Sequence, residues 1–424
     1  MNSPNWKTTD DYRHHRRLPA RMTATLQAGM LLTRAYPAGI GALLCSFGVQ
    51  GDDGAGAPAP SLDQQVESLV RPLANSLADI IFYKIELFGQ DFPLIVLWLA
   101  LAAVFFTFYL GFVNLRGFGL ALRHVRGHYH NPAANGEISH FQAVATAVSG
   151  TVGIGNIGGV AVAIAIGGPG AAFWLFVAGF LSMSTKLVEC TLGVKYRSYN
   201  PDGSVSGGPM YYLEHYLASR GAPRWGKLLG GFYALSLVIG CLGIGNMFQS
   251  NQAYVQFVTI TGGDQSFFAE RGWLFGLLIA ATVAVVIIGG IRSIARVAAH
   301  IVPFMGILYV ICALIIIGMS AEHLPAAIGL ILGNAFEVDS VTGGMVGAII
   351  VGFQRALFSN EAGIGSASIA HSAVQTDEPA SEGLVSLLEP FIDTMVICTL
   401  SSLVIVTTAY PNGLMDNGLE AVSY

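Results

Sequence analysis

The sequence predicts an all-α membrane protein built from two repeats that cross the bilayer in opposite directions. Three observations predict this fold class. Hydrophobic residues make up 53% of the 424 residues and charged residues 11%, whereas soluble domains carry about 25% charged residues. Several apolar runs approach the roughly 20 residues that a helix needs to cross a bilayer. Two of these runs are interrupted by glycines at corresponding positions of the two repeats.

The first ninety residues differ from the rest of the chain. Residues 1–58 begin polar and basic, and the part from Met30 onward has the arginine, short apolar stretch and small residues of a signal peptide. We therefore expect translation to start at Met30 or Met22; the alternative for this leader is a disordered cytosolic tail followed by a weak helix. Residues 59–90 have the pattern of an amphipathic helix on the extracytoplasmic membrane surface. A multi-pass transmembrane domain is expected over residues 91–424.

Eight apolar runs are expected to cross the membrane. The first is uninterrupted, whereas the second and seventh contain glycine-rich motifs. Residues 321–336 form a run that is too short to span and is flanked by loop signals, so we expect it to lie at the interface. The predicted spans are Phe92–Val113, Phe141–Gly168, Ala171–Val194, Leu228–Ile260, Trp273–Gly290, His300–Met319, Val341–Val374 and Leu384–Ala409.

Basic residues in alternate loops predict the orientation. Cytoplasmic loops carry an excess of Lys and Arg, so the first span is expected to enter from outside, with the mature N-terminus outside. The broken second and seventh spans then run in opposite directions. The basic residues are Arg116, Arg123 and Arg126 after the first span, Lys195, Arg197, Arg220, Arg224 and Lys227 after the third, and Arg292 and Arg296 after the fifth.

The two interrupting motifs are "SGTVGIGNIGG" (Ser149–Gly159) and "SNEAGIGS" (Ser359–Ser366). An unwound helix at mid-membrane exposes N–H and C=O groups that lipid cannot satisfy, so protein, water or a bound polar solute must meet them. The N-termini of half-helices favour a carboxylate, and freed carbonyls favour a cation. An amino acid bound together with Na⁺ matches both sets. The alternative is that the glycines only allow close helix packing.

Polar side chains within the two motifs are candidates for the site. Asn156 is costly at mid-membrane unless paired, so we expect it to contact a ligand or another helix. Glu361 could coordinate a cation or carry a proton, but the pattern favours a structural ion pair with Arg355 or Lys186.

Other polar residues lie in apolar segments outside the motifs. Lys186 and Glu189 are three apart and predict a local pair. Glu389 and Asp393 lie one turn apart near the cytoplasmic end of the eighth span and are expected to be solvated. In the fourth span, Asn246 and Gln249 share one helix face, so they either line a cavity or bond between helices.

The common enzyme signatures are absent from the sequence. The sequence contains no HExxH motif, no Walker lysine loop, no GxSxG motif and no paired His/Cys spacing for a metal. A channel is possible, but two mid-membrane breaks suit alternating access better than a continuous filter. The sequence therefore favours a membrane transporter without an organic cofactor and without a nucleic-acid partner.

The motifs resemble the alanine or glycine:cation (sodium) symporter family. The resemblance rests on "GTVGIGNIGGVAVAIAIGGPGAAFW", "TKLVECTLGVKYR", "GGPMYYLE", "IVPFM" and "FSNEAGIGSASIAHSA", and covers about residues 80–410. It implies a five-plus-five inverted-repeat fold preceded by one additional helix. The first motif is also similar to the "GNAVGLGN"-type break of neurotransmitter:sodium symporters, and this similarity implies that the carbonyls of Ser149 and Val152 bind Na⁺. The residues that it places at the substrate are Gly150, Thr151, Gly153, Gly155, Asn156, Ser359, Asn360, Gly363 and Gly365, to which the polar stripe adds Asn246 and Gln249.

The chain departs from this family after the eighth span. Three further spans follow in the family, whereas here the second repeat has only two of its five helices before the sequence ends at "YPNGLMDNGLEAVSY". The expected function is Na⁺-coupled import of alanine or glycine across a bacterial inner membrane. The alternatives are a truncated, non-transporting membrane remnant and a ligand-gated channel.

Overall fold

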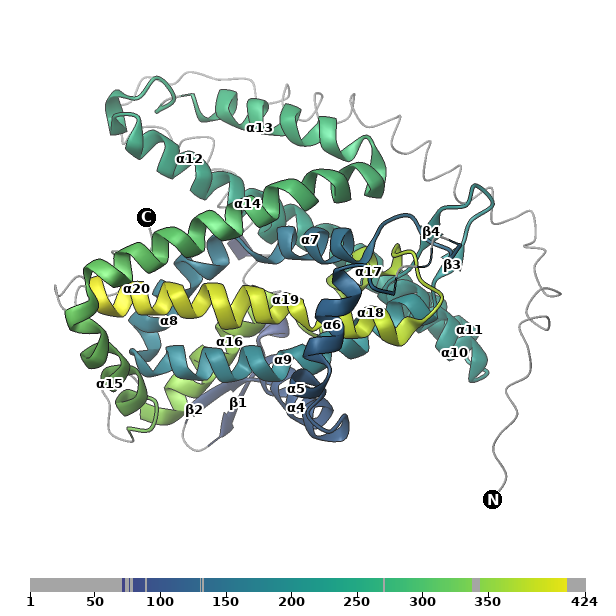
Figure 1. Ribbon diagram of the computed structural model, residues 1–424, viewed down its shortest axis with the longest axis horizontal. Helices are drawn as coiled ribbons and strands as arrows, with labels where there is room; N and C mark the ends of the chain where they lie inside the picture. Colours follow the sequence, from purple (N-terminus) through teal and green to yellow (C-terminus); the bar gives the residue numbers. More distant parts are fainter. Residues whose placement is uncertain are drawn as a thin grey trace, which may run out of the picture. The chain divides into compact units, whose positions relative to one another are not determined.

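Helices dominate the part of the chain that the structure, a computed structural model, describes (Figure 1). The described residues are 71–409 without 73–75, 77–78, 88–89, 130, 132, 270 and 338–343. The chain from Ala74 onward clusters as one compact unit. The leader over residues 1–58 lies outside the described residues, as do most of the amphipathic segment over 59–90 and residues 410–424.

The end of the segment predicted as an amphipathic helix is instead a hairpin. Strands β1 (Lys84–Leu87) and β2 (Gln90–Pro93) pair antiparallel, and Lys84 forms an exposed ion pair with Asp91 at 3.7 Å. The helical prediction is wrong for this part because Lys-Ile-Glu-Leu alternates polar and apolar side chains, the period of a strand rather than of a helix. Residues 79–81, just before the hairpin, are helical.

Among the described residues, four helices are long and apolar enough to cross a membrane, and a bent pair makes a fifth. Two shorter apolar helices, α4 (Leu94–Tyr109) and α13 (Gly272–Ile287), coincide with the first and fifth predicted spans. The four long helices are α9 (Gly170–Lys195), α14 (Gly290–Met319), the continuous run α11 (Pro223–Gly240), η3 (Cys241–Phe248) and α12 (Gln249–Ile260), and the run α18 (Pro379–Ser386), α19 (Leu388–Pro390), η6 (Phe391–Cys398) and α20 (Thr399–Thr408).

The two predicted interruptions are present. The second span consists of α7 (His140–Thr151), the short η2 (Ile154–Asn156) and α8 (Gly158–Gly167), with a bend of 65°. The seventh consists of α16 (Gly344–Asn360) and α17 (Ser366–Ser372). The connecting elements are α5 (Val113–Arg116), α6 (Phe118–Val125), β3 (Ser198–Tyr199), β4 (Val205–Ser206), α10 (Pro209–Ser219), η4 (Gly263–Gln265), η5 (Ala321–His323) and α15 (Leu324–Asn334).

Helix α9 is the central element of the packing. It contacts α4, α16 and α18, and its Leu175, Ala178 and Met183 are 2% exposed or less. Small residues allow the backbones to approach closely, since a Cβ on Gly352 of α16 would lie 2.7 Å from the carbonyl oxygen of Ala171. This packing brings α9 against both halves of the seventh span.

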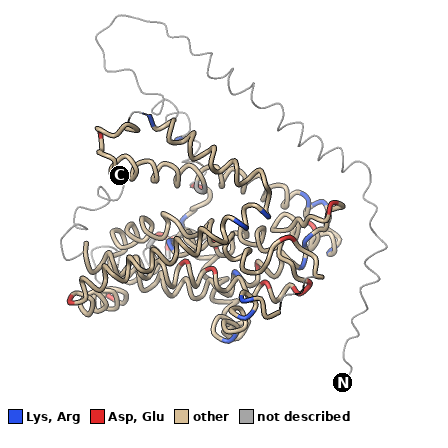
Figure 2. Tube along the Cα trace, turned by 45° about the horizontal axis from the view of Figure 1, so that its top comes forward, with Lys and Arg blue, Asp and Glu red and all other residues tan. Residues whose placement is uncertain are grey.

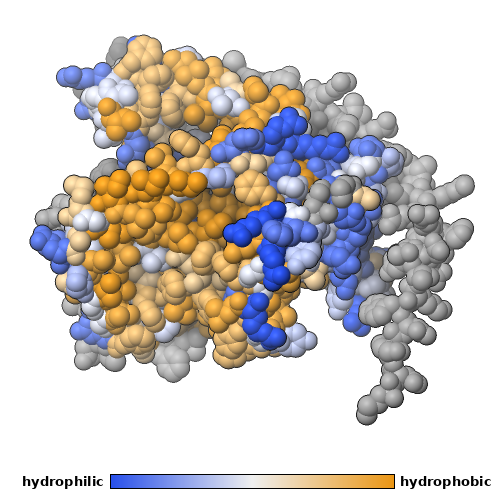
Figure 3. All heavy atoms as spheres, viewed as in Figure 1, coloured by the Kyte–Doolittle hydropathy of each residue, from blue (hydrophilic) through white to orange (hydrophobic). Residues whose placement is uncertain are grey.

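Polar and apolar surfaces are separated. Exposed hydrophobic side chains cover the long helices in Figure 3, whereas hydrophilic residues gather around α6, α10 and the junction of α13 with α14. Most Lys and Arg residues gather toward the same end of the helices in Figure 2. The apolar band is suited to lipid, and one end of the bundle carries most of the positive charge.

Candidate functional site

In the first break, the side-chain amide of Asn156 holds the backbone that follows helix α7. Helix α7 ends at Thr151, and the extended backbone of Val152 and Gly153 leads into η2. The Gly153 N–H donates to the side-chain Oδ1 of Asn156 at 2.8 Å. A Cβ added at Gly150 or Gly155 would meet no atom within 4 Å. The break thus satisfies part of its freed backbone internally and leaves space beside its glycines.

The second break depends on left-handed backbone. Between α16 and α17, Glu361, Gly363 and Gly365 have φ angles of 53°, 89° and 93°. A Cβ on Gly365 would lie 2.3 Å from Cγ of Pro209, so this position accepts only glycine. The Gly363 N–H donates to Oε2 of Glu189 at 2.9 Å. A carboxylate of α9 therefore caps the backbone that the break releases.

The two breaks meet in one buried polar centre. Asn156 Nδ2 lies 3.0 Å from the hydroxyl of Ser359, which joins the first motif to the second. Both side chains converge on Asp393, whose Oδ1 accepts from Asn156 at 2.7 Å and whose Oδ2 accepts from Ser359 at 2.9 Å. Asn156 and Asp393 are completely buried. Residues more than 200 positions apart thus share one hydrogen-bonded cluster.

Thr394 extends this cluster to the next residue of the second motif. Its hydroxyl donates to Asp393 Oδ2 at 2.7 Å and accepts from Nδ2 of Asn360 at 3.1 Å. The Oδ1 of Asn360 in turn accepts from the Ala362 N–H at 3.0 Å. Asp393 and Thr394 lie in η6, a wide-turn helical segment of a kind frequent at functional sites.

The expectation that Glu389 and Asp393 are solvated is wrong. Both are completely buried, because the segment from Pro379 packs along α9 rather than emerging into water. Within the described residues, no Lys, Arg or His lies within ion-pair distance of Asp393. A buried carboxylate that is held by neutral donors is a centre to which a cation can be added.

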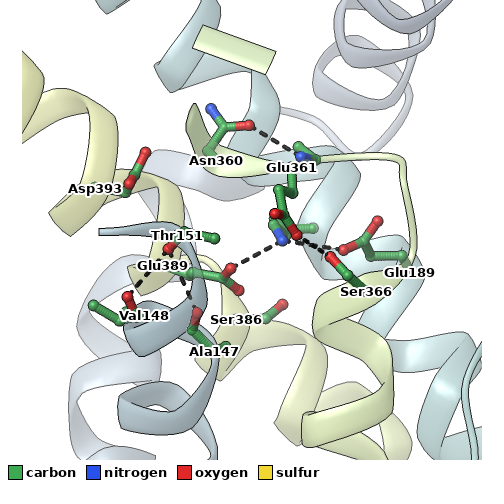
Figure 4. A network of polar contacts seen from close by, with 12 residues as sticks. Ala147, Val148, Thr151, Glu189, Asn360, Glu361, Ser366, Ser386, Glu389 and Asp393 are labelled. Carbon is green, nitrogen blue, oxygen red and sulfur yellow. Dashed lines mark hydrogen bonds and ion pairs between the residues drawn. The ribbon is translucent and has the colours of Figure 1, made fainter. Parts of the chain in front are cut away.

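The prediction of an ion pair for Glu361 is also wrong for the residues described. Its carboxylate accepts a short hydrogen bond from Ser366 across the break (Figure 4), since Lys186 is engaged elsewhere. The Lys186 ammonium lies 3.3 Å from Glu189, which confirms the local pair, and 2.9 Å from Glu389 (Figure 4). The close-up also shows Glu361 and Ser366 facing one another across the loop.

The remaining predicted residues lie at different distances from this centre. Thr151 is buried, and its hydroxyl lies 3.5 Å from the carbonyls of Ala147 and Val148 in its own helix. The Oε1 of Gln249 accepts from the Ile154 N–H at 3.4 Å, so the fourth span reaches the first break. By contrast, Ser149 is exposed and bonds to Thr146, and the exposed Asn246 bonds to the carbonyl of Cys241.

The half-helices α7 and α17 run in opposite directions. The residues before α7 are joined to those after α17, because the Glu137 N–H donates to Ala373 O at 2.7 Å and the Gln375 N–H to Ile138 O at 2.8 Å. From this joint α7 leads toward the first break, whereas α17 leads from the second break back to the joint.

A buried guanidinium fastens the same joint. Arg197 donates to the carbonyls of Asn135, Ser372, Val374 and Thr376 at 2.5–2.9 Å. Its side chain is 6% exposed. The joint is therefore held by side-chain as well as backbone hydrogen bonds.

Comparison with known proteins decides the family. The family model described as "Sodium:alanine symporter family" matches residues 76–423, which include both breaks and Asp393. The chain belongs to the sodium:alanine symporter family. Membership in this family agrees with the several apolar helices of a multi-pass membrane protein. The function named for the family is amino acid transport coupled to sodium.

Relatives in this family carry related names. The chain is 39% identical over 328 residues to the sodium/alanine symporter AgcS of Methanococcus maripaludis, covering 76% of this chain and 70% of that protein. It is 35% identical over 313 residues to the probable sodium/glutamine symporter GlnT of Bacillus subtilis, covering 74% and 62%. It is 38% identical over 282 residues to the putative sodium/proton-dependent alanine carrier protein YrbD of Bacillus subtilis, covering 66% and 55%. The matched part thus spans 55% to 70% of these relatives of the symporter family.

Sequence reasoning missed Asp393 and Thr394. The signal was available, because an acid inside the apolar run "LVSLLEPFIDTMVICTL" is a functional candidate by default. Assigning the acid to the water-exposed end of the eighth span hid it.

Proposed function

We propose that this chain is a Na⁺-coupled symporter that imports a small neutral amino acid, alanine or glycine, by alternating access. The observation that carries the proposal is the junction of Asn156, Ser359 and Asp393, in which both helix breaks contribute to one buried centre. Movement of one repeat against the other would open this centre to each side in turn. Binding the solute between two breaks links its occupancy to that movement.

The chemistry of the centre fits an alkali cation and an amino acid. Hard cations prefer oxygen ligands, and the carboxylate of Asp393 adds a full negative charge to the backbone carbonyls of Ser149 and Val152. The substrate carboxylate would lie at the first break, beside Thr151 and Gly153, where Gly150 and Gly155 leave open space. Ser359, Asn360, Gly363 and Gly365 would close the site from the other side. Gln249 would border it, whereas Asn246 would reach it only after a movement of its helix.

The proposed architecture is the five-plus-five inverted repeat. Helix α4 would precede the repeats, α7 to α14 would form the first, and α16 to α20 would begin the second. The basic end of the bundle would face the cytoplasm of a bacterial cell, with the inner membrane as its location and the mature N-terminus outside. The leader (residues 1–58) would precede an extracytoplasmic segment (59–90) whose last residues enter the β1–β2 hairpin.

Uptake of radiolabelled alanine into proteoliposomes tests the function. With the full chain reconstituted, an inward Na⁺ gradient is expected to drive accumulation above the external concentration, and a choline gradient is not. Equilibration without accumulation in both buffers would indicate a channel. No alanine-specific flux in either buffer would leave the non-transporting remnant.

A further inference from the structure

A line of seven titratable side chains crosses the bundle beside the proposed substrate centre. They come from six helices, α6, α7, α18, α17, α19 and α9, the last of which carries two of them, and six of the seven are 5% exposed or less. The line consists, in spatial order, of His124, His140, Glu382, His371, Glu389, Lys186 and Glu189.

Glu382 links two histidines at the centre of this line. Its Oε1 lies 2.5 Å from Nδ1 of His371, and its Oε2 makes a shorter contact with Nδ1 of His140. Each imidazole thus turns the same nitrogen toward one shared carboxylate. The Nε2 of His371 faces Glu389, the next group in the line, and the ring of His140 packs against His124, so both rings have neighbours on two sides as a proton shuttle requires.

The two ends of the line reach different environments. At one end the rings of His124 and His140 meet edge to face, 5.5 Å between centroids, and His124 is partly exposed. Burial, followed by the neighbouring His140, lowers the pKa of His124, which favours the neutral form of its ring. At the other end Glu189 accepts the N–H of Gly363, inside the second helix break.

The charge balance requires mobile protons. The line contains three buried carboxylates but a single ammonium, Lys186. Uncompensated buried charge is costly, so two further protons are needed for neutrality, and Glu382 with the two imidazoles that contact it is placed to share them. Other titratable groups facing the line from the described elements are Arg123, Cys190, Tyr212, Tyr233 and Asp393.

One contact in the line is open. The Nε2 of His371 lies 3.8 Å from Oε2 of Glu389, beyond hydrogen-bond distance, while Oε1 of the same carboxylate lies 2.9 Å from the Lys186 ammonium. A turn of the Glu389 side chain toward the ring would close this gap. The carboxylate therefore lies between the Lys186 ammonium and the His371 ring.

We propose that this line is a proton relay between the basic end of the bundle and the second helix break, so that protons take part in the transport cycle. In each transfer a proton binds Nε2 of His371 as the proton on Nδ1 of that ring passes to Oε1 of Glu382. The proton on Oε2 of Glu382 then passes to Nδ1 of His140, and the proton on Nε2 of His140 leaves toward His124. One N–H bond forms and one breaks at each ring, and no net charge is left behind. The part played in transport rests on the proposed symport, whereas the protonation chemistry does not.

Solid-state NMR of ¹⁵N-histidine in the full chain, reconstituted in lipid bilayers, tests the relay without requiring transport. On titration from about pH 5 to about pH 9, the ring signals of His140 and His371 are expected to shift together. Glu382→Gln is expected to shift both, and His371→Gln and His140→Gln assign the signals. If each histidine keeps one protonation state over the whole range, the relay is overturned whether or not alanine is carried, and the wild-type titration alone decides this.

A transport measurement tests the second half of the proposal. In proteoliposomes with trapped pyranine, alanine uptake is expected to acidify the lumen, and His371→Gln is expected to reduce this acidification by about tenfold or more. The matched control is Asn114→Leu, which breaks a buried hydrogen bond to the Phe180 carbonyl outside the line and is expected to keep the acidification per alanine. Alanine uptake with unchanged internal pH would overturn proton participation while leaving Na⁺ symport intact.

Discussion

Asn156, in the first helix break, donates a hydrogen bond of 2.7 Å to Oδ1 of Asp393, which lies 237 positions later in the chain. Asp393 also accepts from Ser359 of the second break at 2.9 Å. One carboxylate therefore senses the position of both interrupted helices. The contact between Asn156 and Asp393 is therefore central to the candidate site.

Replacing Asp393 with Asn tests its role toward the cation. The amide keeps the size of the side chain but removes the negative charge, so the Na⁺ concentration for half-maximal alanine uptake is expected to rise about 10- to 100-fold. Asp202→Asn, in an exposed loop, is the control and should leave uptake unchanged. Wild-type Na⁺ dependence in the Asp393 variant would refute this role.

The contact between the two breaks can be measured by a double-mutant cycle. Asn156→Ala and Ser359→Ala each remove one side of the bond, and the coupling energy is expected to be about 0.6 kcal/mol, as for hydrogen bonds between membrane helices. Unfolding of the four proteins in detergent gives this value. A coupling of zero would mean that the two motifs are adjacent without being joined.

Gly365→Ala tests the backbone of the second break. The left-handed φ of 93° and the 2.3 Å approach to Pro209 both oppose a methyl group, so the variant is expected to lose about 1–3 kcal/mol of stability. Gly306→Ala is the control, because that glycine lies within α14 and has nothing within 4 Å. The control is expected to be neutral or up to about 1 kcal/mol more stable. Equal melting temperatures for the two variants would contradict the strain argument.

Lys186→Met is expected to destabilise the fold by about 3–5 kcal/mol, because Glu189 and Glu389 would be left as buried, uncompensated charges. Combining it with Glu189→Gln and Glu389→Gln removes those charges and should recover much of the loss. Thermal unfolding of the purified proteins provides the comparison. A triple variant no more stable than the single one would show that the ammonium acts by packing instead.

Much of the helical plan could be predicted from the sequence. Apolar runs predicted the membrane-spanning helices, and both interruptions occur at the glycine-rich motifs. The sixth span begins earlier than expected, since α14 starts at Gly290 rather than at His300. Arg292, Arg296 and His300 lie in its first turns, at the polar end of the bundle, where hydropathy alone assigns a loop.

The site was only half predictable. Asn156, Ser359 and Asn360 belong to local motifs, so their patterns could be recognised. Asp393 becomes visible only when the eighth span is placed against the two breaks, because its burial comes from contacts distant in sequence. The ion pair wrongly predicted for Glu361 has the same cause. Lys186 pairs with Glu389 instead, and this partner cannot be identified from spacing along the chain.

The four carbonyls gathered by Arg197 come from segments adjoining both interrupted helices. Half-helices α7 and α17 thus share a common anchor at the basic end. Because both half-helices are held at this anchor, a tilt of α7 is expected to be transmitted to α17, and the reverse. Tilting of α7 and α17 would widen or narrow the space at mid-membrane, while the hydrogen bonds of Arg197 at the basic end stay intact.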